Sequence, residues 1–79
     1  MENTEKRIIN ILKSINEDIC SFKGNNLLEE KVIDSFEVME IIAALEDEFN
    51  IEIDPDYVIV ENFANIQSII DMIKKCLEA

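Results

Sequence analysis

Apolar residues recur along most of this chain at the three- and four-residue spacing of an α-helix. Between Asn3 and Phe22 they fall on one side of a helix, which predicts a first helix over this range with Asn3 or Thr4 as its N-terminal cap. Lys23-Gly24 follows, and glycine just past the last periodic position is a common helix end. The apolar positions of this first segment are Ile8, Ile11, Leu12, Ile15, Ile19 and Phe22.

A second apolar stripe predicts a helix from Glu37 to Phe49. At about 100° per residue, Phe36, Glu40, Ala43 and Asp47 then gather on the opposite face, which we expect to point outward. The stripe itself consists of Val38, Ile41, Ile42, Leu45 and Phe49.

Two further helical segments complete the predicted fold. Asp54-Pro55 resembles a helix start and predicts a short third segment over Asp56 to Val60, and Asn65 begins the last helix. The pattern therefore predicts an all-α fold, a small four-helix bundle with three longer helices and one short third helix, in a single domain over residues 1–79. The last stripe consists of Ile66, Ile69, Ile70, Ile73 and Leu77.

The connection between the first two long helices holds the most informative residue. It runs for about eleven residues, which is long for a compact domain, and its leucine, valine and isoleucine side chains predict that it is pinned over the core. Ser35 stands where this connection meets the helix. A serine there can cap the helix by accepting a backbone N–H bond, or it can present its hydroxyl to another protein.

The negative charge of the chain is concentrated around Ser35. Residues 29–61 contain twelve acidic residues against Lys31 alone, and the remaining acids and bases cancel. Such a field repels nucleic acid and favours encounters with basic protein surfaces.

Several kinds of chemistry are excluded by composition. The chain has no histidine, so a Ser-His-Asp arrangement is impossible. Cys20 and Cys76 are far apart without metal-ligand spacing, so we expect no metal site and interpret both as buried thiols of a reduced protein. The apolar runs are too short to span a membrane. We therefore expect a soluble, cytoplasmic protein without catalytic residues of its own.

The motif around Ser35 resembles that of the acyl carrier protein family. Members carry Asp-Ser-Leu or Asp-Ser-Met followed by a helix that ends in a Leu-Glu-x-Glu-Phe-like string, and here Asp34-Ser35-Phe36 precedes a helix ending in residues 45–49, Leu-Glu-Asp-Glu-Phe. Length, acidity and helix order agree over the whole chain. Members often have glycine two positions before the aspartate, where this chain has Val32.

This resemblance implies a cofactor and an attachment residue. Ser35 would carry 4′-phosphopantetheine through a phosphodiester, attached by a separate phosphopantetheinyl transferase that uses coenzyme A, with Asp34 as the neighbour that the transferase recognises. The thiol of the arm would hold an acyl group as a thioester for enzymes of fatty-acid or polyketide biosynthesis.

The resemblance also implies a docking surface. Acyl-loading, aminoacyl-loading and condensing enzymes would bind the outward face of the second helix through basic, partly apolar patches, and we expect the carrier to be a monomer. The residues implied in this docking are Phe36, Glu40, Ala43, Glu46 and Asp47.

Two alternatives remain open from the sequence. A stand-alone aminoacyl or D-alanyl carrier would share fold and cofactor but differ in cargo, and an acidic helical adaptor would never receive the cofactor. The apolar run from Tyr57 to Val60 has three possible roles. It can cover a bound acyl chain, dock a partner or fill the core. We expect it to fill the core, because a small core needs every apolar side chain.

Overall fold

The computed structural model describes residues 3–78, which form four α-helices and two 3₁₀ turns and contain no β-strand. This confirms the predicted all-α class. Within the same residues, no helix has the length and apolar character needed to cross a lipid bilayer. The elements are α1 (Thr4–Ile15), α2 (Asp18–Ser21), α3 (Ser35–Phe49), η1 (Pro55–Tyr57), η2 (Val60–Phe63) and α4 (Ile66–Glu78).

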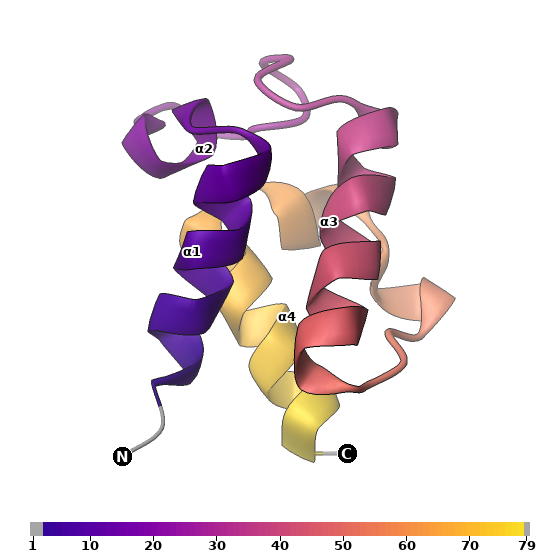
Figure 1. Ribbon diagram of the computed structural model, residues 1–79. Coiled ribbons are helices and arrows are strands. Elements are labelled where there is room, and N and C mark those ends of the chain that lie inside the picture. Colours follow the sequence, from indigo (N-terminus) through magenta and orange to yellow (C-terminus); the bar gives the residue numbers. More distant parts are fainter. Residues whose placement is uncertain (1–2, 79) are drawn as a thin grey trace.

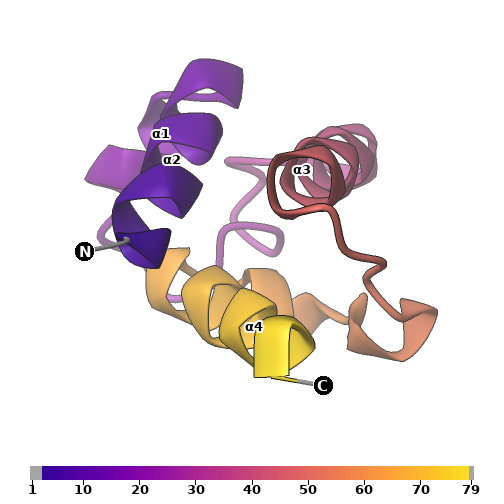
Figure 2. The ribbon, with the colours of Figure 1, turned by 60° about the horizontal axis from the view of Figure 1, so that its bottom comes forward.

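The long helices run along the molecule in opposite directions. α1 leaves the end at which both chain termini lie, α3 returns toward that end, and α4 runs the same way as α3 (Figure 1). The turned view shows α3 almost end-on, with α1 and α4 placed around the same centre (Figure 2). The first turn of α3 therefore lies at the end of the molecule opposite to the termini.

The core forms where the apolar stripes of the three long helices meet. Each stripe supplies side chains with no exposed surface, and residues of the connections close the gaps between them. Burial of this apolar surface is the main favourable term in folding. Among the residues that the structure describes, the positions of the long helices with no exposed surface are Ile8 and Leu12 of α1, Ile41 and Leu45 of α3, and Ile69 and Ile73 of α4.

The first helix is shorter than the sequence predicts. α1 ends at Ile15, the backbone of Asn16 is extended (φ −156°, ψ 106°), and the single turn of α2 follows. The Asn16 side-chain oxygen accepts a hydrogen bond from the Asp18 N–H at 2.9 Å. The prediction of one helix over residues 3–22 is wrong because asparagine offers the backbone an alternative to continued helix. The apolar pattern still holds, since Ile19 is buried.

The predicted short third helix is replaced by the two 3₁₀ turns. Asp54 caps η1, since its Oδ1 accepts a hydrogen bond from the Asp56 N–H at 2.8 Å, and Pro55 opens the turn. The expectation that the apolar run fills the core is wrong for Val58 to Val60, which are 37–47% exposed. Consecutive residues of a tight turn point in different directions, so they cannot all face the core.

The connection before α3 is pinned, as its apolar residues predict. Leu27 and Ile33 are buried, and Val32 is half-buried. The Leu27 N–H donates to the Ala64 carbonyl at 2.8 Å, and the Leu27 carbonyl accepts from Val32 at 2.9 Å and from Ile33 at 3.3 Å. The first of these bonds attaches the connection to the segment that precedes α4, and the other two close the connection on itself.

The two cysteines differ in their surroundings. Both are free thiols. Cys20 is exposed in α2, so the prediction that both are buried is wrong for this residue. Cys76 is half-buried, and burial raises the pKa of its thiol, with smaller contributions in the same direction from the negative charges of Asp54 and Glu46.

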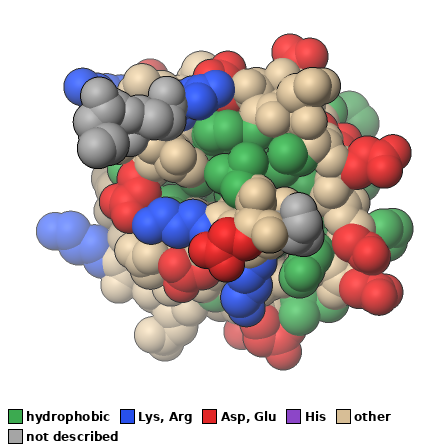
Figure 3. Space-filling view, turned by 90° about the horizontal axis from the view of Figure 1, so that it is seen from below, with side chains coloured by type: hydrophobic (Ala, Val, Ile, Leu, Met, Phe, Trp, Pro, Cys, Tyr) green, Lys and Arg blue, Asp and Glu red, His purple; other side chains and the backbone are tan. Residues whose placement is uncertain are grey.

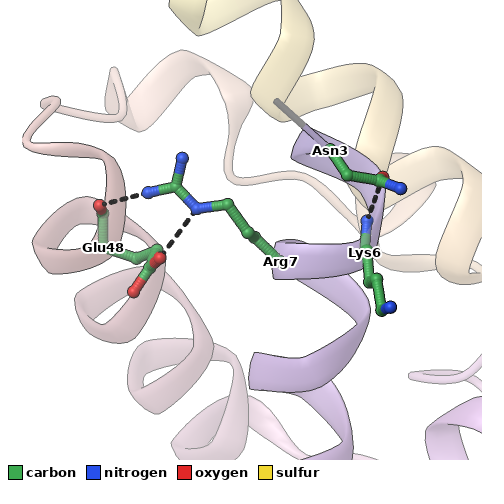
Figure 4. Close-up of polar contacts among 4 residues, drawn as sticks. All are labelled: Asn3, Lys6, Arg7 and Glu48. Atoms are coloured by element: carbon green, nitrogen blue, oxygen red, sulfur yellow. Dashed lines mark hydrogen bonds and ion pairs between the residues drawn. The ribbon is translucent and has the colours of Figure 1, made fainter. Parts of the chain in front are cut away.

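A clamp joins α1 to the last turn of α3. The Arg7 guanidinium donates from Nε to Glu48 Oε2 at 2.8 Å and from Nη2 to the Glu48 carbonyl at 3.1 Å (Figure 4). It also lies 4.4 Å from the centre of the Phe49 ring. Nearby, Asn3 caps α1 as predicted by accepting from the Lys6 N–H.

Candidate functional site

The candidate site begins with the cap of α3. Asp34 has an extended backbone (φ −118°, ψ 179°), and its Oδ1 accepts a hydrogen bond from the Glu37 N–H at 2.9 Å. Asp34 is therefore the N-terminal cap, and Ser35 is the first residue of the helix. Of the two uses open to Ser35 in the sequence, capping is excluded because the aspartate already fills that position.

Ser35 differs from the other serines of the chain. Its side chain is exposed, and its hydroxyl has no hydrogen-bond partner among residues 3–78. The hydroxyl is thus free to meet a group from outside the chain. The other three hydroxyls donate within their own segments, Ser14 to the Ile11 carbonyl at 2.8 Å, Ser21 to the Asp18 carbonyl at 3.4 Å and Ser68 to Asn65 Oδ1 at 3.1 Å.

The position of Ser35 suits a phosphate group. The first N–H groups of a helix have no partners within it, and the helix dipole places partial positive charge at this end. A phosphodiester oxygen on the Ser35 side chain would lie near that positive end of a fifteen-residue helix. The described part of the chain holds no group of acidic or thiol side chains suited to a metal ion.

An apolar groove starts beside Ser35. It has a volume of about 160 Å³ and lies between Leu28 of the connection, the first turns of α3 and the segment 58–63, which includes η2. Ligand pockets that hold a whole small molecule measure about 300–1,000 Å³, so this groove suits a narrow chain and not an enclosed substrate. Its lining residues are Leu28, Ser35, Val38, Val58, Ile59, Val60 and Phe63.

The outward face of α3 is open, as the sequence predicts. Phe36 is 77% exposed, and Glu40, Ala43 and Asp47 are exposed along the same side of the helix. Glu46 differs from these four, because it is half-buried and its Oε2 accepts a hydrogen bond from a backbone N–H at 2.8 Å. That carboxylate holds the chain after α3 in place.

Acidic side chains cluster on the same side of the molecule. Seen from the end that holds the termini, the right side, where α3 and η1 lie, shows carboxylates and apolar side chains without lysine or arginine (Figure 3). The left and centre show side chains of both charges. The charge asymmetry of the sequence is therefore also an asymmetry in space. The outward face of α3, with exposed Phe36 beside the carboxylates of Glu40 and Asp47, is suited to a basic protein surface with an apolar centre.

The backbone before the site contains an unusual conformation. Lys31 has φ of 64°, in the left-handed region that disfavours residues with a Cβ atom. Its N–H donates to the Leu28 carbonyl at 3.1 Å. The family resemblance leads one to expect glycine at the position of Val32. The left-handed conformation is instead found one position earlier, at Lys31.

Residues 6–73 match the family model of the phosphopantetheine attachment site. The chain belongs to this family. An acyl carrier protein of Buchnera aphidicola subsp. Baizongia pistaciae is 39% identical over 79 residues, which cover 95% of this chain and 96% of that protein. The resemblance to carrier proteins and the phosphopantetheine cofactor are thereby confirmed, and the family consists of carriers, not of catalysts.

Some features of this carrier were not visible in its sequence. Asn16 contacts the connection before the site and the first turn of α3, although the sequence places it inside a continuous helix. Val58 to Val60 line the groove beside Ser35 instead of the core. The presence of an asparagine was not a sufficient signal for a helix end at Asn16, because Asn10 lies inside α1 without ending it.

Proposed function

We propose that this carrier holds acyl intermediates on a 4′-phosphopantetheine group attached to Ser35 and serves fatty-acid or polyketide biosynthesis. One observation carries the assignment to Ser35. Because Asp34 caps α3, the exposed Ser35 hydroxyl takes part in no hydrogen bond within residues 3–78. When bound, the cofactor supplies a thiol that forms thioesters.

The residues around Ser35 have separate tasks in attachment. Asp34 holds the first turn of α3 and is the neighbour that we propose the transferase recognises. The Ser35 oxygen forms a bond to phosphorus, the pyrophosphate bond of coenzyme A breaks, and adenosine 3′,5′-bisphosphate leaves. We assign the proton of the hydroxyl to a base of the transferase.

The outward face of α3 would bind the partner enzymes. Phe36 supplies an exposed apolar contact, Ala43 leaves room for a partner side chain, and the carboxylates of Glu40 and Asp47 attract a basic rim. Glu46 would contribute through its charge, since its Oε2 is already engaged with the backbone. Exposed ion pairs of this kind are weak and screened by salt, which suits a carrier that must dissociate.

The negative charge around α3 indicates the kind of cargo. The acidity around α3 favours an acyl carrier over a stand-alone aminoacyl or D-alanyl carrier, which would share this fold and cofactor. We further propose that residues 1–79 act as one domain, as a monomer, in the cytoplasm, with phosphopantetheinyl transferase, loading enzymes and condensing enzymes as partners. A nucleic-acid partner is not expected from a chain with a net charge of −11.

Intact-mass measurement tests the attachment residue. The purified protein is incubated with coenzyme A, magnesium and a broad-specificity phosphopantetheinyl transferase, and we expect a mass gain of one phosphopantetheinyl group. Ser35→Ala should show no gain, while its free energy of unfolding changes by less than about 0.5 kcal/mol because Ser35 is not the cap.

Ser21→Ala is the matched control, since Ser21 is also exposed but bonds to its own helix. It should be loaded like the unchanged protein. Loading of Ser35→Ala would contradict the assignment, and failure of the folded protein to load with its native transferase would favour the adaptor. Loading assays with an acyl-activating and an amino-acid-adenylating enzyme then separate the two kinds of cargo.

A further inference from the structure

Asn16 connects three segments of the molecule at the end where Ser35 lies. It is half-buried at the end of α1, and its backbone N–H still donates to the Leu12 carbonyl at 2.9 Å. Its side-chain Nδ2 donates to the Val32 carbonyl and to Glu37 Oε1, both at 3.1 Å. Its Oδ1 accepts from the Asp18 N–H at 2.9 Å. One amide thus bonds to the connection before α3, to α3 and to α2.

The two Nδ2 contacts bracket the attachment motif. Val32 lies two residues before Asp34, and Glu37 lies two residues after Ser35. Glu37 also gives its backbone N–H to Asp34, so the cap and the Asn16 contact meet at the same residue. Between these contacts Ile33 is buried and Asp34 caps the helix, whereas the side chain of Ser35 is exposed and has no hydrogen-bond partner within residues 3–78.

The chemistry of this position requires an asparagine. A neutral amide offers two donors and an acceptor at a short reach, and all three directions are used here. Aspartate would keep the acceptor but lose both donors and repel Glu37. Alanine would lose every side-chain contact and leave the Val32 carbonyl and the Glu37 carboxylate without this partner.

We propose that Asn16 is a positioning residue for the loading of Ser35. It holds the chain on both sides of the Asp34-Ser35 pair and so keeps the hydroxyl in the conformation that the transferase accepts. This inference rests on the proposed function of Ser35. Without Asn16 the competent conformation is a smaller fraction of the folded protein, and the apparent affinity of the transferase falls by that fraction.

Transferase kinetics with Asn16→Ala test the proposal. We expect KM for the carrier to rise about 5- to 30-fold, as for the loss of one to two hydrogen bonds, while kcat stays within about two-fold because the bound conformation is unchanged. Arg7→Ala is the matched control, since Arg7 joins the same two helices at the opposite end of the molecule (Figure 4). It should leave KM unchanged.

A double variant provides a rescue. Asn16→Asp should raise KM at least as much as Asn16→Ala, because the new carboxylate faces Glu37. Adding Glu37→Gln places a donor opposite the new carboxylate and restores one of the two lost contacts. We therefore expect the double variant to recover part of the loss in KM, which a general effect of instability would not produce.

Amide hydrogen exchange in the unloaded protein gives a readout that does not depend on Ser35 chemistry. In Asn16→Ala, exchange should speed up at Val32, Ile33 and Glu37, whose N–H groups are hydrogen-bonded here, and should not do so in Arg7→Ala. If the unchanged protein is not loaded, the proposed function fails while exchange still decides the role of Asn16. Equal exchange in both variants, or an unchanged KM in Asn16→Ala, would overturn the inference.

Discussion

The two ends of α3 are fixed in different ways. At the Phe49 end, the Arg7 guanidinium holds Glu48 by an ion pair and a backbone contact and stacks on the aromatic ring. At the Ser35 end, the neutral amide of Asn16 links α1 to the Val32 carbonyl and to the Glu37 carboxylate, and this link contains no cation. The first end is closed by the clamp, whereas the second leaves an exposed hydroxyl beside an apolar groove.

This difference shows how a small helical domain can combine a rigid frame with an accessible site. A cationic side chain beside Ser35 would bind a phosphate on Ser35 and the carboxylates of the docking face, and would so compete with the basic groups of partner enzymes. An amide holds the backbone without adding charge, so the field around Ser35 stays negative and the positive end of the helix stays available. The strongly charged contact lies at the end where no chemistry is expected.

Truncation of a core side chain of α3 should have the largest effect on the free energy of unfolding. Leu45 is fully buried in α3 between the two ends, and Leu45→Ala should lower the free energy of unfolding by about 2–5 kcal/mol through lost burial and a cavity. Urea unfolding followed by circular dichroism measures the loss. Leu77→Ala is the matched control, since Leu77 is 40% exposed, and should cost less than about 1 kcal/mol. Equal losses would contradict the packing described above.

Opening the clamp should have an intermediate effect limited to one end. Arg7→Ala should cost about 1 kcal/mol at low salt, because the ion pair is more than a third exposed and the ring contact adds little. The loss should shrink when unfolding is repeated at high salt. Arg7→Lys keeps the charge but not the two-point contact, so it should recover only part of the stability. A loss that is independent of salt would indicate packing instead of charge.

Relief of backbone strain at the Ser35 end should have the smallest effect, and in the opposite direction. Lys31 adopts a left-handed conformation that costs about 1–2 kcal/mol for a residue with a Cβ atom, so Lys31→Gly should remove that cost. Glycine also gains freedom in the unfolded chain, which leaves a net stabilisation of about 0.5 kcal/mol. Lys31→Ala controls for the lost charge and should show no gain. Destabilisation by glycine in thermal unfolding would be evidence against strain at this position.

The sequence was sufficient for α3 and α4 and for the apolar stripes that they bury, apart from Leu77 near the end of α4, which is 40% exposed. The stripe of α3 predicted that Val38, Ile41 and Leu45 are buried and that Phe36 is exposed, and the structure agrees. Burial along a helix can be predicted from the sequence because helical periodicity is a local property of neighbouring residues. The carrier and its cofactor were indicated by the resemblance of Asp34-Ser35-Phe36, together with the helix that follows, to the motif of acyl carrier proteins.

The tertiary structure alone decided how the candidate site is held. It ended the first helix at Asn16, gave the cap to Asp34 and left Val58 to Val60 beside Ser35. The cap is a local contact of Asp34 with Glu37, three residues further on. The other two outcomes depend on partners that are distant in the chain, since Asn16 bonds to groups 16 and 21 residues away and Val58 to Val60 lie beside Ser35. Such contacts have no periodic signature, because they form only when packing of the apolar stripes has brought the segments together.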